Sequence, residues 1–152
     1  MIDGVKIIRI ESHKDKRGFF REILRQKNKY TNINFKQISH SFIKKNITKG
    51  WHLHKKQYQW NYLVIGKINV WLFDTRKKSK TYKKSLNINI DSNKDKILYF
   101  FPPGLAHGYK TISKINHIIY GTSGYYDKTE EKKLNLNNDL IPNHFKKSEK
   151  KK

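Results

Sequence analysis

Short apolar runs, rich in Ile, Tyr, Phe and Trp, recur along the chain between polar stretches rich in Lys and Asn. Runs of this length and composition are typical of β-strands. Leu86, Ile88 and Ile90 alternate with Asn87 and Asn89, which is the period of a strand buried on one face. We therefore predict strands over residues 5–10, 18–24, 35–43, 58–65, 67–73, 86–90, 97–101 and 116–122.

Glycine and proline mark the turns between these runs. Gly66 alone separates residues 58–65 from residues 67–73, which favours a tight hairpin of two paired strands. Pro102-Pro103-Gly104 ends the run over residues 97–101 as a sharp turn. The pattern thus supplies both the strands and the points at which the chain reverses.

These elements indicate one all-β domain, a β-sandwich or small barrel that can hold a small ligand inside. A chain of 152 residues is the usual length for a single domain, which we place at residues 1–145. Residues 130–136 are expected to form a short turn of helix. Residues 146–152 contain five lysines and are expected to be a disordered tail.

The chain carries a formal charge of +22, from 34 Lys and Arg against 12 Asp and Glu. A strong basic excess is one property of nucleic-acid-binding proteins. Here, however, it consists of 29 Lys and only 5 Arg, whereas nucleic-acid recognition relies on the planar guanidinium of Arg. We expect a solvated, lysine-rich surface and no nucleic-acid partner, and keep a polyanion-binding module as an alternative.

The lack of cysteine and of long apolar segments excludes several further classes of protein. The chain has no cysteine, which excludes disulfides, thiolate metal sites and cysteine nucleophiles. No segment reaches the roughly 18 apolar residues of a membrane-spanning helix, and the first residues lack the apolar stretch of a signal peptide. We therefore expect a cytoplasmic protein without a membrane partner.

Histidine and tyrosine side chains mark a candidate site. His52 and His54 are two residues apart and share one face of a strand. His107 follows the Pro-Gly turn, and Tyr120 ends the run His117-Ile118-Ile119-Tyr120. Imidazole titrates near neutrality and can act as a general base. Each of these side chains could instead be packed in the core, most simply His54 and Tyr120.

These residues belong to motifs whose order and spacing resemble the dTDP-4-dehydrorhamnose 3,5-epimerase family over about residues 4–140. The motifs are Arg17-Gly18-Phe19-Phe20-Arg21-Glu22, Gln37-Ile38-Ser39-His40-Ser41, Gly50-Trp51-His52, Asp74-Thr75-Arg76, Pro102 to Gly108, and Tyr120 to Tyr126. The resemblance implies a cupin-like jelly-roll barrel, a homodimer and no cofactor. It also implies epimerisation of a nucleotide-linked 4-keto-6-deoxy-hexose, with dTDP as the expected nucleotide.

The implied reaction assigns catalytic roles. A carbon beside a ketone loses a proton to give an enolate, and an acid on the opposite ring face returns one, which inverts the centre. By resemblance His52 is the base and Tyr120 the acid. His107 would be a second pocket histidine that donates to the sugar or to the enolate oxygen.

Further residues of the motifs would bind the substrate. By resemblance Arg17, Gln37 and Lys49 contact the nucleotide or its diphosphate, and Glu22 accepts a hydrogen bond from a base N–H. Phe20 and Tyr125 would stack the base, partly across a dimer. The alternative for Arg17 and Glu22 is that they only pair with each other.

The chain also departs from the family pattern. The family usually has an Asp near its C-terminus that orients the base, and no matching Asp is identified here. Gln59 stands where a Lys is usual, and His54 where a Gln is usual; we count both as substrate-binding residues. The base then lacks its usual partner, so epimerisation at C3 or C5 alone is one alternative. Conversion by a nucleotide-sugar 3,4-ketoisomerase is another.

A metal site would need more than the three histidines. His52, His54 and His107 offer imidazole ligands, but metal-binding cupins add a carboxylate a few residues after the H-x-H pair. The corresponding positions begin with Lys55 and Lys56, whose charges would oppose a dication. We expect no metal ligand.

Overall fold

The computed structural model describes residues 1–26 and 30–135, and the tail predicted at residues 146–152 lies outside them. The described residues form strands and no helix. The strands are β1 (Lys6–Arg9), β2 (His13–Asp15), β3 (Gly18–Phe20), β4 (Gln37–Lys44), β5 (Thr48–His54), β6 (Gln59–Ile65), β7 (Lys67–Asp74), β8 (Ser85–Asp91), β9 (Ile97–Phe101), β10 (Leu105–Thr111), β11 (Ile115–Thr122) and β12 (Glu131–Lys133).

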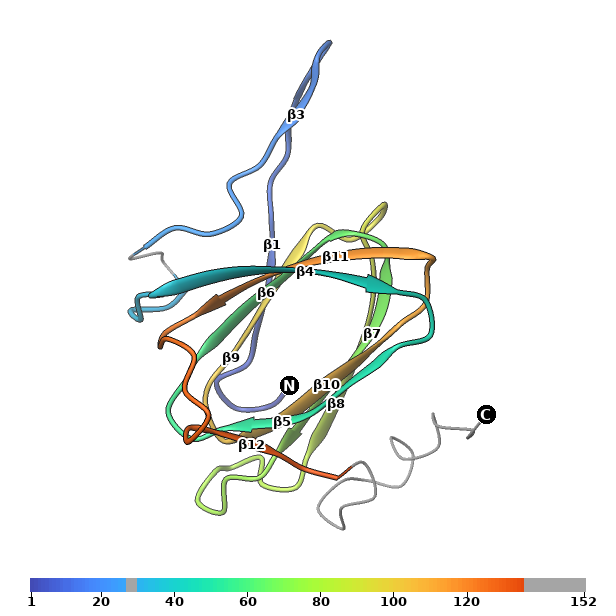
Figure 1. Ribbon diagram of the computed structural model, residues 1–152. Coiled ribbons are helices and arrows are strands. Elements are labelled where there is room, and N and C mark those ends of the chain that lie inside the picture. The colour runs from blue at the N-terminus through green and yellow to red at the C-terminus, as the bar shows by residue number, and fades with distance from the viewer. Residues whose placement is uncertain (27–29, 136–152) are drawn as a thin grey trace.

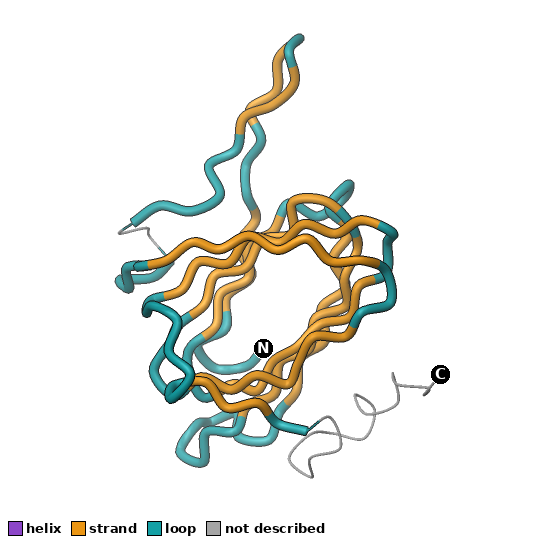
Figure 2. Tube along the Cα trace, in the orientation of Figure 1, coloured by secondary structure: helices purple, strands orange, loops and turns teal. Residues whose placement is uncertain are grey.

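Two five-stranded antiparallel sheets face each other and enclose the interior (Figures 1 and 2). The first sheet has the strand order β1-β9-β6-β11-β4, and the second has the order β12-β5-β10-β7-β8. A separate hairpin of β2 and β3 projects away from the two sheets (Figure 1). The predicted all-β sandwich is confirmed.

Apolar side chains fill the space between the sheets and also cover both outer faces. The inner cluster includes Leu63, Ile68 and Leu72, which are all at most 1% exposed. Trp60 and Phe100 belong to a second cluster with side chains of the 23–35 segment. The remaining cluster joins Trp51, Trp71, Phe73, Ala106 and Leu134. Strand β6 is buried on both faces from Gln59 to Leu63 and is therefore mostly apolar, whereas the edge strands β4 and β8 each leave one face exposed.

Gly66 does not form the predicted hairpin. β6 pairs with β9 and β11 in the first sheet, whereas β7 pairs with β8 and β10 in the second. Gly66 has a φ of 115°, and a Cβ there would clash with the side chain of Asn116. The same side chain accepts a hydrogen bond from the backbone N–H of Lys67 at 3.1 Å. Gly66 is therefore a corner between sheets, a distinction that local sequence patterns do not make.

The predicted turn of helix over residues 130–136 is also wrong within the part that the structure describes. Residues Glu131–Lys133 form β12, which pairs antiparallel with β5 and places Glu131 opposite His54. Leu134 then donates its backbone N–H to Trp51 O at 2.8 Å and is buried beside that ring. Pairing with the edge of β5 outweighs local helix propensity here.

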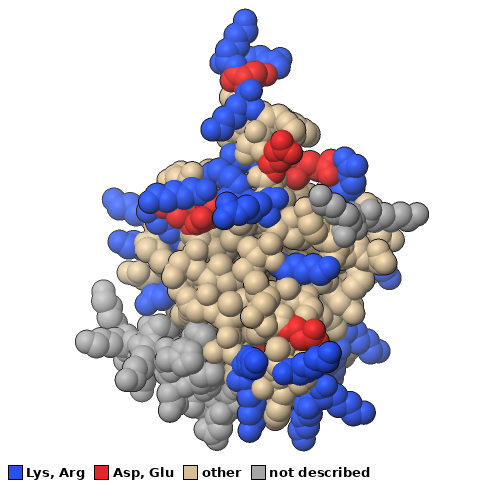
Figure 3. Space-filling model, turned by 180° about the vertical axis from the view of Figure 1, so that it is seen from behind, with Lys and Arg blue, Asp and Glu red and all other residues tan. Residues whose placement is uncertain are grey.

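The 18–24 prediction is too long, since only Gly18–Phe20 forms a strand. In the described residues, no segment forms a helix that is long and apolar enough to cross a bilayer. The face drawn in Figure 3 carries separate groups of Lys and Arg side chains around a broad uncharged area. That face therefore offers no continuous basic track, in keeping with a solvated lysine-rich surface.

Candidate active site

A cavity of about 260 Å³ lies between the two sheets. Both sheets contribute polar side chains to its wall, among aromatic and aliphatic ones such as Phe101 and Leu72. It brings together most of the residues predicted for the site, namely Gln37, Lys49, His52, His54, Gln59, His107 and Tyr120.

Strand β5 places three of these residues on the cavity because its alternation changes at Gly50. His52 and His54 face the cavity, while Trp51 between Gly50 and His52 is fully buried in the opposite cluster. Gly50 has a φ of 151°, and a Cβ on it would lie 2.9 Å from the Cα of Gly108. The register between β5 and β10 shifts at the same point, so Lys49 also reaches the cavity.

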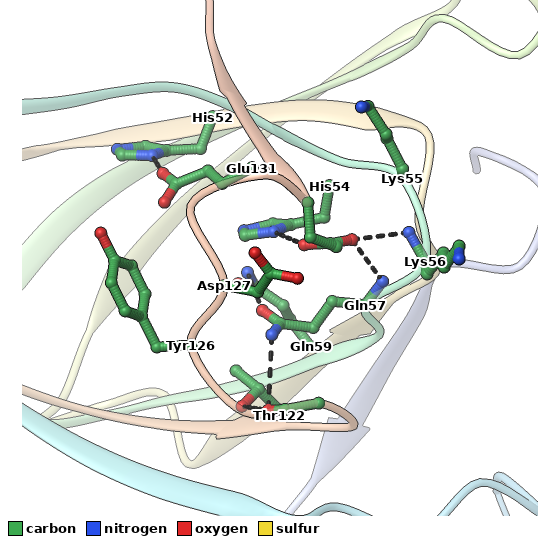
Figure 4. Close-up of polar contacts among 12 residues, drawn as sticks. His52, His54, Lys55, Lys56, Gln57, Gln59, Thr122, Tyr126, Asp127 and Glu131 are labelled. Carbon is green, nitrogen blue, oxygen red and sulfur yellow. Dashed lines mark hydrogen bonds and ion pairs between the residues drawn. The ribbon is translucent and has the colours of Figure 1, made fainter.

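His52 and His54 each contact a carboxylate through the Nδ1 atom (Figure 4). The Nδ1 atom of His52 bonds to Glu131 Oε1, and that of His54 bonds to Glu130 Oε2 at 2.7 Å. A carboxylate on Nδ1 fixes the tautomer that leaves the lone pair on Nε2. Both imidazoles are thus oriented with Nε2 available as a base or as an acceptor.

Glu130 is held in place more firmly than a single histidine bond requires. Its other oxygen accepts the backbone N–H groups of Lys56 at 2.6 Å and Gln57 at 2.9 Å (Figure 4). Burial raises the pKa of Glu130, but the bonds from Lys56, His54 and Gln57 outweigh it and keep the pKa below its ordinary value. Glu130 is therefore a carboxylate that can stabilise a positive charge on His54.

His107 lies between the other two histidines and is neutral. Its ring centroid is 5.9 Å from that of His52 and 5.4 Å from that of His54. Burial, with the nearby His54, lowers the pKa of His107 to about 3. Its Nδ1–H donates to Leu105 O at 3.1 Å, so Nε2 carries no proton. In this state His107 accepts hydrogen bonds, whereas the sequence suggested a donor.

Tyr120 reaches the cavity from β11, in the first sheet, opposite the histidines of the second sheet. Its hydroxyl lies 2.7 Å from that of Tyr109 on β10. Burial raises the pKa of Tyr120, and the hydrogen bonds of Tyr109 and Ser41 to its oxygen oppose that effect. The cavity therefore places imidazole and phenol groups on facing walls.

Amide side chains occupy the rest of the wall. Gln37 donates to Ser39 Oγ at 2.9 Å and accepts the backbone N–H of Tyr126 at 3.1 Å. Gln59 is 7% exposed, and its Nε2 donates a long hydrogen bond of 3.5 Å to Gln57 Oε1. Asn61 is 3% exposed, and its buried Oδ1 has no hydrogen-bond partner among the described residues. Such a buried acceptor on a cavity wall is suited to a ligand hydroxyl.

Four predicted binding residues do not reach the cavity of their own chain. Arg17 and Phe20 belong to the projecting β2–β3 hairpin, and Phe20 is 68% exposed. Glu22 bonds to Arg25, and Arg17 bonds to Asp15 at 2.6 Å, so the expected alternative of an Arg17–Glu22 pair is not observed. Tyr125 is 70% exposed and is absent from the cavity wall.

The residues that sequence reasoning missed are Glu130, Glu131, Tyr109 and Asn61. Glu130-Glu131 is the only adjacent acidic pair in the sequence, which was a usable signal. Tyr109 and Asn61 lie in apolar strands, where nothing local separates them from core residues. Among residues 1–26 and 30–135, no group of three or more His, Asp or Glu side chains is placed to hold a metal ion.

A two-sheet β-sandwich whose interior cavity holds histidine–carboxylate pairs on one wall and a tyrosine on the facing wall has the architecture of a cupin-like enzyme, and these groups are suited to moving protons. The family model described as dTDP-4-dehydrorhamnose 3,5-epimerase matches residues 1–150, and the chain belongs to this family. The cupin-like fold and the membership expected from the sequence motifs are both confirmed.

Individual relatives agree with this assignment. The spore coat polysaccharide biosynthesis protein SpsL of Bacillus subtilis is 33% identical over 144 residues, covering 93% of this chain and 94% of that protein. The dTDP-4-dehydrorhamnose 3,5-epimerase of Salmonella typhimurium is 29% identical over 147 residues. This match covers 92% of this chain and 80% of that protein.

One solved structure resembles this chain over most of the length of both proteins. The dTDP-6-deoxy-D-glucose-3,5-epimerase of Legionella pneumophila, in complex with dTDP-4-keto-L-rhamnose, has a TM-score of 0.80. It is 26% identical to this chain and the similarity covers 88% of this chain and 73% of that one.

Proposed function

We propose that the chain epimerises a dTDP-linked 4-keto-6-deoxy-hexose at C3, at C5 or at both, through an enolate, in deoxysugar biosynthesis. The observation that carries the proposal is the His52–Glu131 pair on one wall of the cavity with Tyr120 on the facing sheet. Relatives with this activity and a relative bound to a dTDP-keto-sugar support it.

His52 is the base in this proposal. Its Nε2 removes the proton from the carbon beside the C4 ketone, and the electrons of that C–H bond form the enolate. The imidazolium that results is stabilised by Glu131 at Nδ1. The same base serves C3 and C5, because both carbons flank the ketone.

Tyr120 is the acid that returns a proton from the other face of the sugar ring. Because it extends from the opposite sheet, a sugar held between the sheets would present one face to His52 and the other to Tyr120. Protonation on the face opposite to deprotonation inverts the centre. The two-sided arrangement is the reason for preferring epimerisation to simple enolisation.

The enolate oxygen needs a positive partner, and His54 is placed to supply it. His54 and its partner Glu130 lie beside His52, and Gln59 cannot contribute a charge. Glu130 stabilises the imidazolium form of His54, which would then donate to the oxyanion. His107 and Asn61 Oδ1 accept hydrogen bonds from sugar hydroxyls. Lys49 and Gln37 contact the diphosphate or nucleotide.

A second copy of the chain would complete the nucleotide site. Arg17, Phe20 and Glu22 lie on or near the projecting hairpin and outside their own cavity. Strand β4, at the edge of the first sheet, carries Ile38 and Phe42 on one face, and these side chains are 58% and 55% exposed. An exposed apolar edge strand is suited to association. We therefore propose a homodimer in which each hairpin reaches the partner's cavity.

Deuterium exchange tests the activity. The protein is incubated in D₂O with 4-keto-6-deoxyglucose linked to dTDP, UDP, GDP or CDP, and proton NMR follows C3 and C5. The proposal expects loss of the C3 or C5 signal and a new epimer, fastest with dTDP. No exchange with any of the nucleotides would contradict it.

The two adjacent histidine–glutamate pairs favour one second candidate, a nucleotide-sugar 3,4-ketoisomerase. Two bases on one face can move a proton between neighbouring carbons through an enediol, so that the keto group passes from C4 to C3. The same NMR sample distinguishes the two reactions, because ketoisomerisation gives a 3-keto product whereas epimerisation keeps the ketone at C4.

A further inference from the structure

Tyr109 and Tyr120 form a hydroxyl pair that crosses the barrel. Tyr109 is on β10 of the second sheet, Tyr120 is on β11 of the first, and both line the cavity. Their oxygens are 2.7 Å apart, which is the usual length of an O–H···O hydrogen bond. The bond therefore ties the proposed acid to the wall that carries the histidines.

Either hydroxyl could donate in this bond, and the surroundings of Tyr109 favour it as the donor. Its side chain is 8% exposed and packs in the inner apolar cluster with Val70 and Ile68. Burial raises the pKa of Tyr109, and the neighbouring Tyr120 raises it further. Both effects favour the arrangement in which Tyr109 keeps its proton and donates it to the Tyr120 oxygen.

Ser41 is a further hydroxyl group near Tyr120. It lies on the neighbouring strand β4 and also lines the cavity, and its hydrogen bond lowers the pKa of Tyr120. A phenol both accepts and donates. When Tyr109 donates to Tyr120, the proton of Tyr120 itself can therefore be directed to a ligand in the cavity.

We propose that Tyr109 is a positioning residue, which donates to Tyr120, aims the Tyr120 proton at the substrate carbon and stabilises the phenolate formed when that proton leaves. This role rests on the proposed function of Tyr120 as acid. In the step, the Tyr120 O–H bond breaks and its electron pair stays on the oxygen. The enolate electrons form the new C–H bond, and water later reprotonates the phenolate.

The first test compares proton exchange with inversion. In D₂O, His52 can return deuterium to the ring face that it deprotonated, which labels the substrate without inverting the centre. Delivery of deuterium by Tyr120 to the opposite face gives the inverted product. Tyr109→Phe removes only the hydroxyl. It should lower the rate of inversion about tenfold, the equivalent of one hydrogen bond, with little change in KM. The ratio of labelled substrate to inverted product should therefore rise.

The second test needs no substrate. Tyrosine labelled with ¹³C at Cζ reports ionisation by its chemical shift, and Tyr120→Phe assigns the Tyr120 signal. Tyr109→Phe should move the Tyr120 titration to higher pH, and Ser41→Ala should do the same. The matched control is Tyr99→Phe, which removes a phenol of the same cavity that is not part of the Tyr109–Tyr120 hydrogen bond. Because Tyr99 and Tyr120 interact only electrostatically, it should move the Tyr120 titration much less than Tyr109→Phe does.

The outcomes separate the two proposals. If Tyr109→Phe leaves both the titration of Tyr120 and the exchange-to-inversion ratio at the wild-type values, Tyr109 is not a positioning residue. If the wild-type protein exchanges no proton on any keto-sugar but the Tyr120 titration still moves, the proposed function fails while the coupling of the two tyrosines stands.

Discussion

At the scale of single residues, the orientation and tautomer of His52 depend on its contact with Glu131. The carboxylate lies on Nδ1 of the imidazole, so the proton of the neutral ring resides there and the lone pair on Nε2 is free. In the proposed reaction Nε2 takes a proton from the sugar, and the negative charge of Glu131 would stabilise the imidazolium. The proposed base therefore has a carboxylate partner in the described part of the chain.

Substituting Glu131 should affect the chemical step more than binding. Glu131→Gln keeps the size of the side chain but removes its charge, so kcat should fall about 100-fold while KM changes little. Steady-state kinetics by NMR or coupled assay measure both constants. Glu131→Asp should restore part of kcat, and full activity of Glu131→Gln would contradict the role of the pair.

His107 should make folding stability depend on pH. Its pKa is lowered to about 3 by burial in the folded chain, whereas an unfolded histidine titrates near 6.5. Between these values the unfolded state binds the extra proton. The stabilisation is complete above about pH 6.5 and is lost as the pH falls toward 3, by at most about 1.4 kcal/mol per pH unit.

Urea unfolding at pH 7.5, 6, 5 and 4 measures this dependence. The free energy of unfolding should fall with pH in the wild-type protein and should fall less steeply in His107→Gln. Parallel slopes for the two proteins would show that His107 is not buried in its neutral form.

At the scale of elements, β5 is the strand on which the site depends. It carries Lys49, His52 and His54, and β12 pairs with it to deliver Glu130 and Glu131. The sequence separation between His52 and Glu131 is 79 residues. No local pattern could join them, since only the pairing of an edge strand brings them together.

Gly50 allows β5 and β10 to approach closely, so Gly50→Ala should be destabilising. The new Cβ would meet backbone at Gly108 and the φ of 151° is unfavourable for alanine. We expect a loss of about 2 kcal/mol, measured by thermal or urea unfolding. Gly124→Ala is the control, because its Cβ would make only an ordinary contact at 3.5 Å with Gln57. Equal stability of the two variants would contradict the proposed close packing.

The sequence predicted the strands where apolar runs and alternation coincide. β8, with its alternating Asn and Ile, was located correctly, as were β4, β9 and β11. The errors at Gly66 and at residues 130–136 share one cause. In both places the conformation is decided by a partner strand remote in sequence, which propensity and periodicity do not contain.

At the scale of the whole molecule, the site residues divide into those inside one cavity and those on the projecting hairpin (Figure 1). The sequence predicted His52 and His54 from their spacing on one strand face, and it predicted His107 and Tyr120 from the motifs of the family. It also proposed Arg17, Phe20 and Glu22, which do not line the cavity of their own chain. Only the proposed homodimer would bring the two groups together.

Mixed dimers test whether the hairpin acts in the partner's cavity. Arg17→Ala and His52→Gln should each be nearly inactive alone. If each site takes Arg17 from one subunit and His52 from the other, random mixing by co-expression should restore about a quarter of wild-type activity, because half of the dimers would have one intact site. Analytical ultracentrifugation confirms the dimer, and no recovery in a verified mixed dimer would contradict the arrangement.

The most direct test of the central claim is proton exchange on the keto-sugar by the wild-type chain and by His52→Gln. Both proteins are incubated with dTDP-4-keto-6-deoxyglucose in D₂O, and NMR measures deuterium at C3 and C5 and the configuration of each centre. We predict deuterium incorporation with inversion in the wild type and loss of both in His52→Gln. Equal exchange by the two proteins would contradict His52 as the base, and so the account of this cavity as the site of epimerisation.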